Sequence, residues 1–146
     1  MALEFQMCNT TQIDSLSRER TVFFFPVGPI EDHGPHLPIG LDLFEAEALS
    51  RKLGEKLESE LQGWTAVLMP TAPLGIDSNT TRFALTVRPH VLRDWLVDAC
   101  LALRRQGFQH FACATGHLGP RQLTAIGWNN RIPTSKSRGC KDTRKV

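Results

Sequence analysis

No apolar run in this 146-residue sequence approaches the roughly 20 residues that a membrane-spanning helix requires. The first residues, MALEFQM, lack the basic stretch followed by an apolar segment that marks a secretory signal. Four cysteines are present, but no Cys-x-x-Cys pair occurs, which argues against a zinc ribbon and a disulfide framework. We therefore expect a cytoplasmic protein, with Cys100 and Cys113 as small buried thiols in apolar surroundings.

Positive charge is scarce outside the last residues. The formal net charge is +2, but residues 131–146 carry six basic side chains and one acidic side chain, a net +5, which leaves −3 for the rest. A mildly acidic domain offers no basic groove for nucleic acid. The length, with 41% hydrophobic and 22% charged residues, fits one globular domain.

Strand-like and helix-like segments alternate along the chain. Thr21–Val27 is a continuous β-branched and aromatic run, typical of a strand covered on both faces. Further strands are expected at 65–70 and 108–114, a short strand or ribbon at 82–87, and helices at about 42–63, 89–107 and from Pro120 onward. This order predicts an α/β domain with a mainly parallel sheet.

The first of the expected helices is amphipathic. Its apolar residues recur at three- and four-residue spacing, while most charged residues fall elsewhere. We therefore expect one face of this helix to pack on the sheet, formed by Ala46, Leu49, Leu53, Leu57 and Leu61.

The most distinctive stretch is the connection at residues 26–42, PVGPIEDHGPHLPIGLD, which holds four prolines and three glycines. Such a connection is stiff and holds side chains in place. It contains Glu31, His33, His36 and Asp42, and carboxylate and imidazole groups together suit Zn²⁺ or Mn²⁺. Two such ions can share a bridging carboxylate. The stretch is therefore interpreted as a metal-binding loop at the carboxyl end of a parallel strand.

A distant histidine is placed to join this loop. His117 lies in TGHLG, a glycine-flanked turn directly after a predicted strand, and ligands bind where parallel strands end. Each residue also has a simpler interpretation: Asp42 can cap the helix that it begins, Glu31 can be a solvated carboxylate, and His117 can merely cap its turn. His90 and His110 are interpreted as structural or surface residues.

Residues 26–42 resemble the signature of the creatininase (creatinine amidohydrolase) family, and TGHLG resembles that family's Asn-Gly-His turn. The similarity runs from about Thr21 to Ile126 and includes PTAPLG at residues 70–75. The resemblance implies a three-layer α/β/α sandwich, commonly assembled as a homohexamer. It also implies a dinuclear Zn²⁺/Mn²⁺ centre that hydrolyses carbon–nitrogen bonds of small cyclic or linear amides.

Carried over position by position, the resemblance assigns Glu31 and His117 to one ion and His33 to the other, with Asp42 as the bridge. His36 would lie around these ligands, where imidazoles orient them. The implied reaction is attack by metal-activated water on an amide carbon polarised by the same centre. The expected partner is a small-molecule amide, without nucleic acid or membrane.

Two positions depart from the family pattern. Thr115 replaces the Asn, and Gly119 stands where creatininase itself has a metal-binding Glu, which argues against creatinine as the substrate. The family continues beyond this length, and its later segment supplies a further carboxylate and a histidine. After His117 the only acid is Asp142 and no histidine follows. We therefore expect a C-terminally incomplete domain whose catalytic residues lie beyond this chain.

Three segments are expected: an N-terminal segment at 1–20, a creatininase-like domain at 21–127 and a basic tail at 128–146. The tail lacks a periodic apolar face, which predicts either disorder or a departure from the parent reading frame near residue 127. The function is accordingly open between a metal-dependent amidohydrolase and an inactive truncated or frameshifted fragment with at most partial metal binding. A non-enzymatic binding module is disfavoured, because it would not need these metal-binding residues together.

Overall fold

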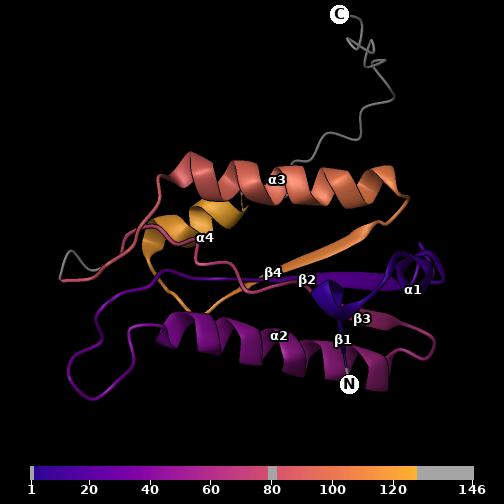
Figure 1. The fold of residues 1–146 in the computed structure, drawn as a ribbon, viewed down its shortest axis with the longest axis horizontal. Helices are drawn as coiled ribbons and strands as arrows, with labels where there is room; N and C mark the ends of the chain where they lie inside the picture. The colour runs from indigo at the N-terminus through magenta and orange to yellow at the C-terminus, as the bar shows by residue number, and fades with distance from the viewer. Residues whose placement is uncertain (1, 79–81, 128–146) are drawn as a thin grey trace, which may run out of the picture.

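The computed structural model describes residues 2–78 and 82–127, and the predicted tail lies outside them (Figure 1). Helices and strands alternate as the hydrophobic pattern predicts. The elements are β1 (Leu3–Glu4), the 3-10 helix η1 (Phe5–Met7), α1 (Thr10–Asp14), β2 (Thr21–Val27), α2 (Leu41–Glu60), β3 (Thr65–Leu68), α3 (Pro89–Arg105), β4 (His110–Thr115) and α4 (Pro120–Gly127).

Four parallel strands form one sheet in the order β1-β3-β2-β4. The central strand β2 is buried along its whole length, which explains its unbroken run of β-branched and aromatic residues. Its last residue, Val27, is in register with Thr115 at the end of β4. The sequence pattern does not predict β1, because a two-residue strand is too short to show a period.

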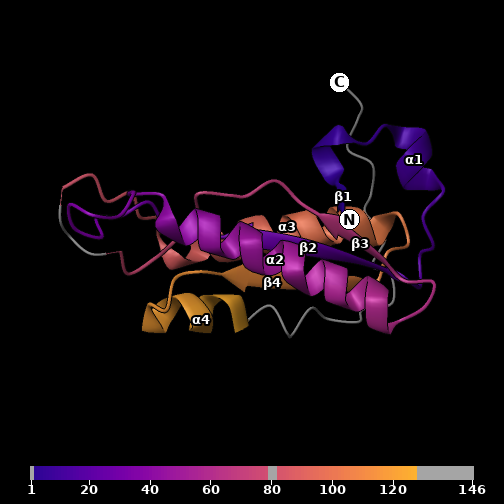
Figure 2. The same ribbon diagram turned by 90° about the horizontal axis from the view of Figure 1, so that it is seen from below.

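Helices cover both faces of the sheet, with α2 on one face and α3 and α4 on the other (Figures 1 and 2). Successive side chains of β2 point to opposite layers. Phe23 belongs to the larger core together with Leu92 of α3, whereas Phe24 joins Ala66 in a smaller core against which Leu57 of α2 packs. The predicted three-layer α/β/α sandwich with a parallel sheet is confirmed.

The prediction for the inner face of α2 is partly wrong. The buried row consists of small residues four positions apart, Ala46, Ser50 and Gly54, whereas Leu49 and Leu53 are 44% and 43% exposed. A Cβ at Gly54 would lie only 2.9 Å from a Cβ of β3. The helix therefore approaches the sheet too closely for large side chains, which the spacing of leucines alone cannot reveal.

The long connection from β3 to α3 runs beside the loop that follows β2. Residues 82–87 do not form a strand, and Leu85 makes only an isolated antiparallel bridge to Ile30. Nearer β3, Ala72 makes a parallel bridge to Val27. Among the described residues, no helix is both long and apolar enough to cross a membrane.

Candidate metal centre

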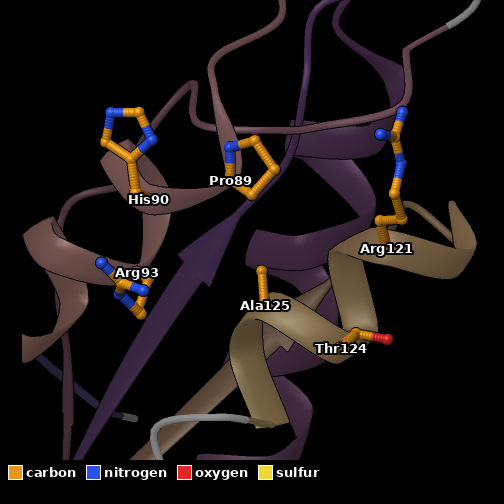
Figure 3. A pocket seen from close by; sticks show the side chains of 6 residues that line it. All are labelled: Pro89, His90, Arg93, Arg121, Thr124 and Ala125. Carbon is orange, nitrogen blue, oxygen red and sulfur yellow. The ribbon is translucent and has the colours of Figure 1, made fainter.

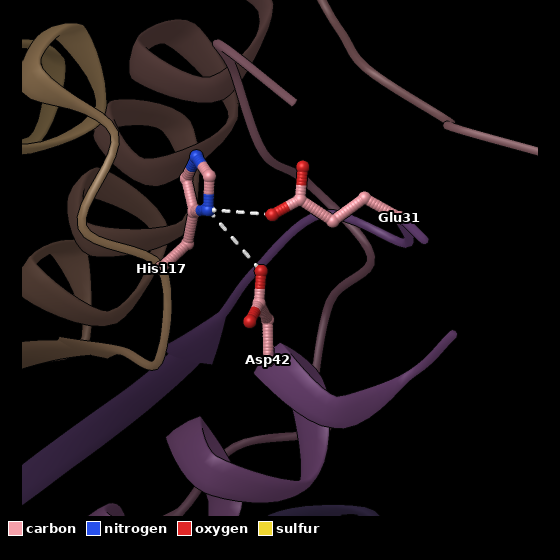
Figure 4. A group of neighbouring side chains, drawn as sticks. All are labelled: Glu31, Asp42 and His117. Carbon is pink, nitrogen blue, oxygen red and sulfur yellow. Dashed lines mark ion pairs between the residues drawn. The ribbon is translucent and has the colours of Figure 1, made fainter. Parts of the chain in front are cut away.

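The candidate site lies at the carboxyl edge of the sheet, where β2 and β4 end side by side. Glu31 and His33 follow β2, while His117 follows β4 by two residues. Asp42 lies in the first turn of α2, the helix that begins after the loop from β2. Figure 4 shows Glu31, Asp42 and His117 converging from these three segments.

Local hydrogen bonds shape the loop after β2. The backbone N–H of Glu31 donates to the carbonyl of Ile39 at 3.0 Å, which closes the base of the loop. At its tip, a carboxylate oxygen of Asp32 accepts from the N–H of Gly34 at 2.8 Å, and Gly34 adopts a φ of +82° that glycine tolerates. Hydrogen bonds at its base and its tip thus hold the loop that its prolines and glycines were expected to make stiff.

Both oxygens of the Asp42 carboxylate face an imidazole, and each faces a different one. Oδ1 lies 3.2 Å from Nε2 of His33, and Oδ2 lies 3.2 Å from Nδ1 of His117. Oε1 of Glu31 lies 3.2 Å from the same His117 nitrogen and 3.9 Å from Nε2 of His33. The structure therefore brings together the four residues that the sequence predicts as metal ligands.

Backbone carbonyls determine which ring nitrogen of each histidine is available. Nε2 of His117 lies 3.0 Å from the carbonyl oxygen of Ile76, and Nδ1 of His33 lies 3.1 Å from that of Glu31. A carbonyl oxygen can only accept, so in neutral rings these nitrogens carry the protons. The opposite nitrogens then present lone pairs toward the carboxylates of Asp42 and Glu31.

Acceptor atoms that face one another in this way fit a shared cation. Ligands at about 2 Å from a tetrahedral zinc ion lie about 3.3 Å apart, close to the three N···O separations of 3.2 Å. Ligand atoms of Glu31, Asp42 and His117 lie within 4.8 Å of one another, and the three side chains are buried. Protonated imidazoles would satisfy the same contacts as ion pairs, so protons and metal compete for this site.

The electrostatics of Asp42 also fit a metal ligand. Burial is the largest influence on the pKa of its carboxyl and raises it, His33 and His117 oppose the rise, and Glu31 adds to it. Among the residues that the structure describes, the buried Oδ2 has no hydrogen-bond partner. Gly40, not Asp42, occupies the N-cap of α2, and no side chain bonds to that cap. The helix-cap interpretation of Asp42 is therefore wrong.

Two glycines let the His117 turn approach its partners. A Cβ at Gly116 would lie 2.6 Å from the backbone oxygen of Asp42, and a Cβ at Gly119 would lie 2.4 Å from Nε2 of His117. Real Cβ atoms do not approach other atoms so closely. In this geometry position 119 cannot carry the glutamate side chain expected for creatininase itself.

The hydroxyl of Thr115 retains a hydrogen-bonding role in the turn. Its Oγ1 accepts from the backbone N–H of His117 at 3.1 Å and from the side-chain amide of Gln122 at 3.2 Å. No motif or spacing in the sequence predicts a role for Gln122 or Ile76. The only signal for Gln122 was its place on the helix face that also holds Ala125 and Ile126, and Ile76 contributes through its backbone.

The other histidines do not join this cluster. His36 is exposed on the turn at the loop tip, and within the described ranges it forms no hydrogen bond or ion pair with the four ligand candidates. Nε2 of His110 lies 3.1 Å from the carbonyl oxygen of Glu19, and its ring packs against Trp64 at an interplanar angle of 52°. His90 is exposed at the start of α3.

A separate hollow of about 200 Å³ lies between the start of α3 and α4 (Figure 3). Three nitrogen-bearing side chains border it, but Arg93 pairs with Asp94 and Arg121 pairs with Asp77. The hollow contains none of the predicted metal ligands. Its lining residues are Pro89, His90, Arg93, Arg121, Thr124 and Ala125.

The fold and the site define an α/β/α protein with a candidate metal centre at the carboxyl edge of its parallel sheet. The family model described as Creatininase, creatinine amidohydrolase, matches residues 6–129. The chain therefore belongs to the creatininase family.

Solved structures of this family share the fold. A putative creatinine amidohydrolase from Bacteroides fragilis is 21% identical with a TM-score of 0.64, and 87% of this chain covers 51% of that one. A structure described as creatininase Mn is 17% identical with a TM-score of 0.68, with coverage of 90% and 52%. A mutant creatininase described as Zn-Zn type is 17% identical with a TM-score of 0.66 and the same coverage.

The chain spans about half the length of the structures that it matches. No curated protein in the comparison matches it.

Proposed function

We propose that this protein is a metal-dependent amidohydrolase that acts on a carbon–nitrogen bond of a small cyclic or linear amide. The observation that carries this proposal is the geometry of Asp42, whose two oxygens each lie 3.2 Å from a different imidazole nitrogen. A carboxylate placed between two ligand groups is the arrangement expected of a bridge between two ions. Family membership supplies the reaction class.

In this proposal Glu31 and His117 would hold one ion, His33 would hold the second, and Asp42 would be shared by both. The contacts of Glu31 Oε1 support the division, since it lies 3.2 Å from His117 but 3.9 Å from His33. Zinc and manganese are the proposed metals, because relatives of the same fold are described with manganese and with two zinc ions. His36 is exposed at the loop tip, so no role in holding these ligands is proposed for it.

When bound, such ions polarise a carbonyl and activate water. The chain's own residues prepare the site for this chemistry. The side chains of Glu31, Asp42 and His117 are each about nine-tenths buried or more, which keeps bulk water from competing for the ligand atoms. The carbonyls of Ile76 and Glu31 hold both imidazoles in one orientation.

A second candidate, metal binding without turnover, is favoured by one observation. The similarity to solved creatininases covers only about half of their length, and position 119 excludes a glutamate ligand in the present geometry. In this alternative the four ligands bind at most a partial centre. Metal content and turnover must therefore be measured separately.

Both candidate functions require bound metal, so the first experiment measures metal content. We expect the purified protein to contain zinc or manganese by elemental analysis, and His33→Ala or Asp42→Ala to lose it. His90→Ala and Asp98→Ala are matched controls, because both residues are exposed and lie on α3. Unchanged metal content in both site variants would sink the proposed centre.

Turnover separates the two candidates. The metal-loaded protein is incubated with cyclic and linear amides, and the amine and carboxylate products are measured by mass spectrometry. Product formation that His33→Ala abolishes supports the amidohydrolase. Metal binding without product across the panel supports the alternative.

We further propose a reducing, cytoplasmic setting and assembly with other copies of the chain. The free thiols of Cys8, Cys100 and Cys113 support the first proposal. Burial raises the pKa of Cys100 to about 11 and that of Cys113 to about 12, so both stay protonated and unreactive. Exposed Leu49 and Leu53 on α2 support the second, since apolar surface of this kind favours association.

A further inference from the structure

Gln122 is an unusual residue for its place in the fold. It lies in α4 on the side that faces the sheet, and its side chain is fully buried, whereas Leu123 beside it is 51% exposed. An amide is stable in such a position only when both of its ends are hydrogen-bonded. The side chain of Gln122 therefore needs hydrogen-bond partners, which apolar packing cannot supply.

Both ends of the Gln122 amide are hydrogen-bonded, and each partner is a residue that also bonds to His117. Oε1 accepts from the backbone N–H of Ile76 at 2.8 Å, and Nε2 donates to the hydroxyl of Thr115 at 3.2 Å. The backbone N–H of Ile76 can only donate, so the amide oxygen must face it. The orientation of the amide is thus determined by chemistry.

The same two residues bond directly to His117. The carbonyl of Ile76 lies 3.0 Å from Nε2 of His117, and the hydroxyl of Thr115 accepts from the backbone N–H of His117 at 3.1 Å. Gln122 therefore ties together the acceptor that orients the imidazole ring and the turn that carries it. Loss of this bridge would free Ile76 to move relative to His117.

A second tie joins the Ile76 loop to α4. A carboxylate oxygen of Asp77 accepts from the backbone N–H of Arg121 at 3.0 Å, and the two side chains form an ion pair. Asp77 adopts a φ of +61°, which turns the loop toward the helix. This contact holds the loop near α4, and Asp77 acts on His117 only through its charge. The hydrogen-bonded link to the imidazole passes through Gln122 and Ile76.

We propose that Gln122 is a positioning residue for the metal centre, which acts by holding the Ile76 carbonyl against Nε2 of His117. It thereby keeps Nδ1 of His117 directed at Glu31 and Asp42 as the metal-binding nitrogen. The inference rests on the proposed function in one respect, that the cluster binds a divalent ion. Residues that orient a ligand in this way commonly affect metal affinity by about 10- to 100-fold.

The test compares Gln122→Met, which has a similar shape but no amide, with Ala125→Gly as a matched control. Ala125 is also buried in α4, and it shares a core cluster with Ile76, but its methyl side chain cannot hydrogen-bond to Ile76 or Thr115. Zinc affinity is measured by competition with a chromophoric chelator. We expect Gln122→Met to bind zinc about 10- to 100-fold more weakly, and Ala125→Gly to change affinity less than threefold.

NMR of the imidazole nitrogens tests the proposed cause, the fixed tautomer and orientation of His117, in the metal-free protein. With the imidazole ring in its neutral form, long-range ¹H–¹⁵N spectra should show the Nε2-protonated tautomer of His117 in the parent protein and a mixture of tautomers in Gln122→Met. If Gln122→Met does not fold by circular dichroism, Thr115→Val breaks the other end of the bridge and is expected to shift both readouts in the same direction.

The outcomes separate the two proposals. Zinc binding by the parent protein, with unchanged affinity and unchanged His117 tautomer in Gln122→Met, overturns the role of Gln122 alone. An equal loss in Ala125→Gly also overturns it, because loosening of α4 would then be the cause. If the parent protein binds no zinc, the proposed centre fails, and the NMR comparison alone decides whether Gln122 orients His117.

Discussion

Replacement of Asp42 by asparagine should change stability in opposite directions with and without metal. The Asp42 side chain is only 5% exposed, and burial raises the pKa of its carboxyl. Asparagine has nearly the same shape but carries no charge to desolvate. Without metal, we therefore expect Asp42→Asn to be more stable than the parent protein at neutral pH.

With metal the order should reverse. A ligand present at 100 times its Kd stabilises the folded state by about 2.7 kcal/mol. Asp42 faces both imidazoles, so its loss weakens both halves of the centre. If affinity falls 100-fold, the same zinc concentration stabilises the variant by only about 0.4 kcal/mol. The difference of about 2.3 kcal/mol corresponds to roughly 10 °C in Tm for a domain of this size.

Thermal melts with a chelator and with added zinc provide the assay, followed by circular dichroism. Asp98→Asn is the control, because Asp98 is an exposed acid on α3. The control should respond to zinc as the parent protein does. An Asp42→Asn variant that is destabilised equally in both conditions would refute the argument, since a purely structural carboxylate gives that result.

Three further predictions follow from burial, close contacts and exposed surface. In the metal-free protein the raised pKa of Asp42 means that the folded state binds more protons than the unfolded state. The free energy of unfolding should therefore fall as the pH rises from about 4 through the raised pKa. Denaturant titrations at several pH values measure this. Gly119→Ala places a Cβ 2.4 Å from Nε2 of His117, so it should weaken zinc affinity at least about tenfold in chelator competition. Leu49→Gln with Leu53→Gln should reduce self-association in analytical ultracentrifugation without changing zinc affinity, because both leucines are exposed on α2.

Each of these predictions has a contrary result. A pH dependence that is identical in Asp42→Asn would show that another group causes the slope. Unchanged affinity in Gly119→Ala would show that the turn can move away from His117 at little cost. A sharp two-state melt of a soluble parent monomer would contradict the expected self-association.

The amino-acid sequence determined the class of fold and the chemical identity of the candidate site. The continuous apolar run at Thr21–Val27 requires a strand buried on both faces, and the structure places it in the centre of the sheet. The candidate ligands Glu31, His33, Asp42 and His117 were recognisable because carboxylate and imidazole groups stood in and beside stiff loops after strands. Residue types and their position relative to predicted strands can be recognised from the sequence alone.

The tertiary structure decided how these residues meet. His117 is distant in sequence from the first loop, and only the pairing of β2 with β4, with Val27 opposite Thr115, brings the two loops to one place. The same packing selected small residues for the inner face of α2 and placed Gln122 between Ile76 and Thr115. The close approach of α2 and the two bonds of Gln122 depend on distances between segments that are far apart along the chain, so neither periodicity nor a motif predicted them.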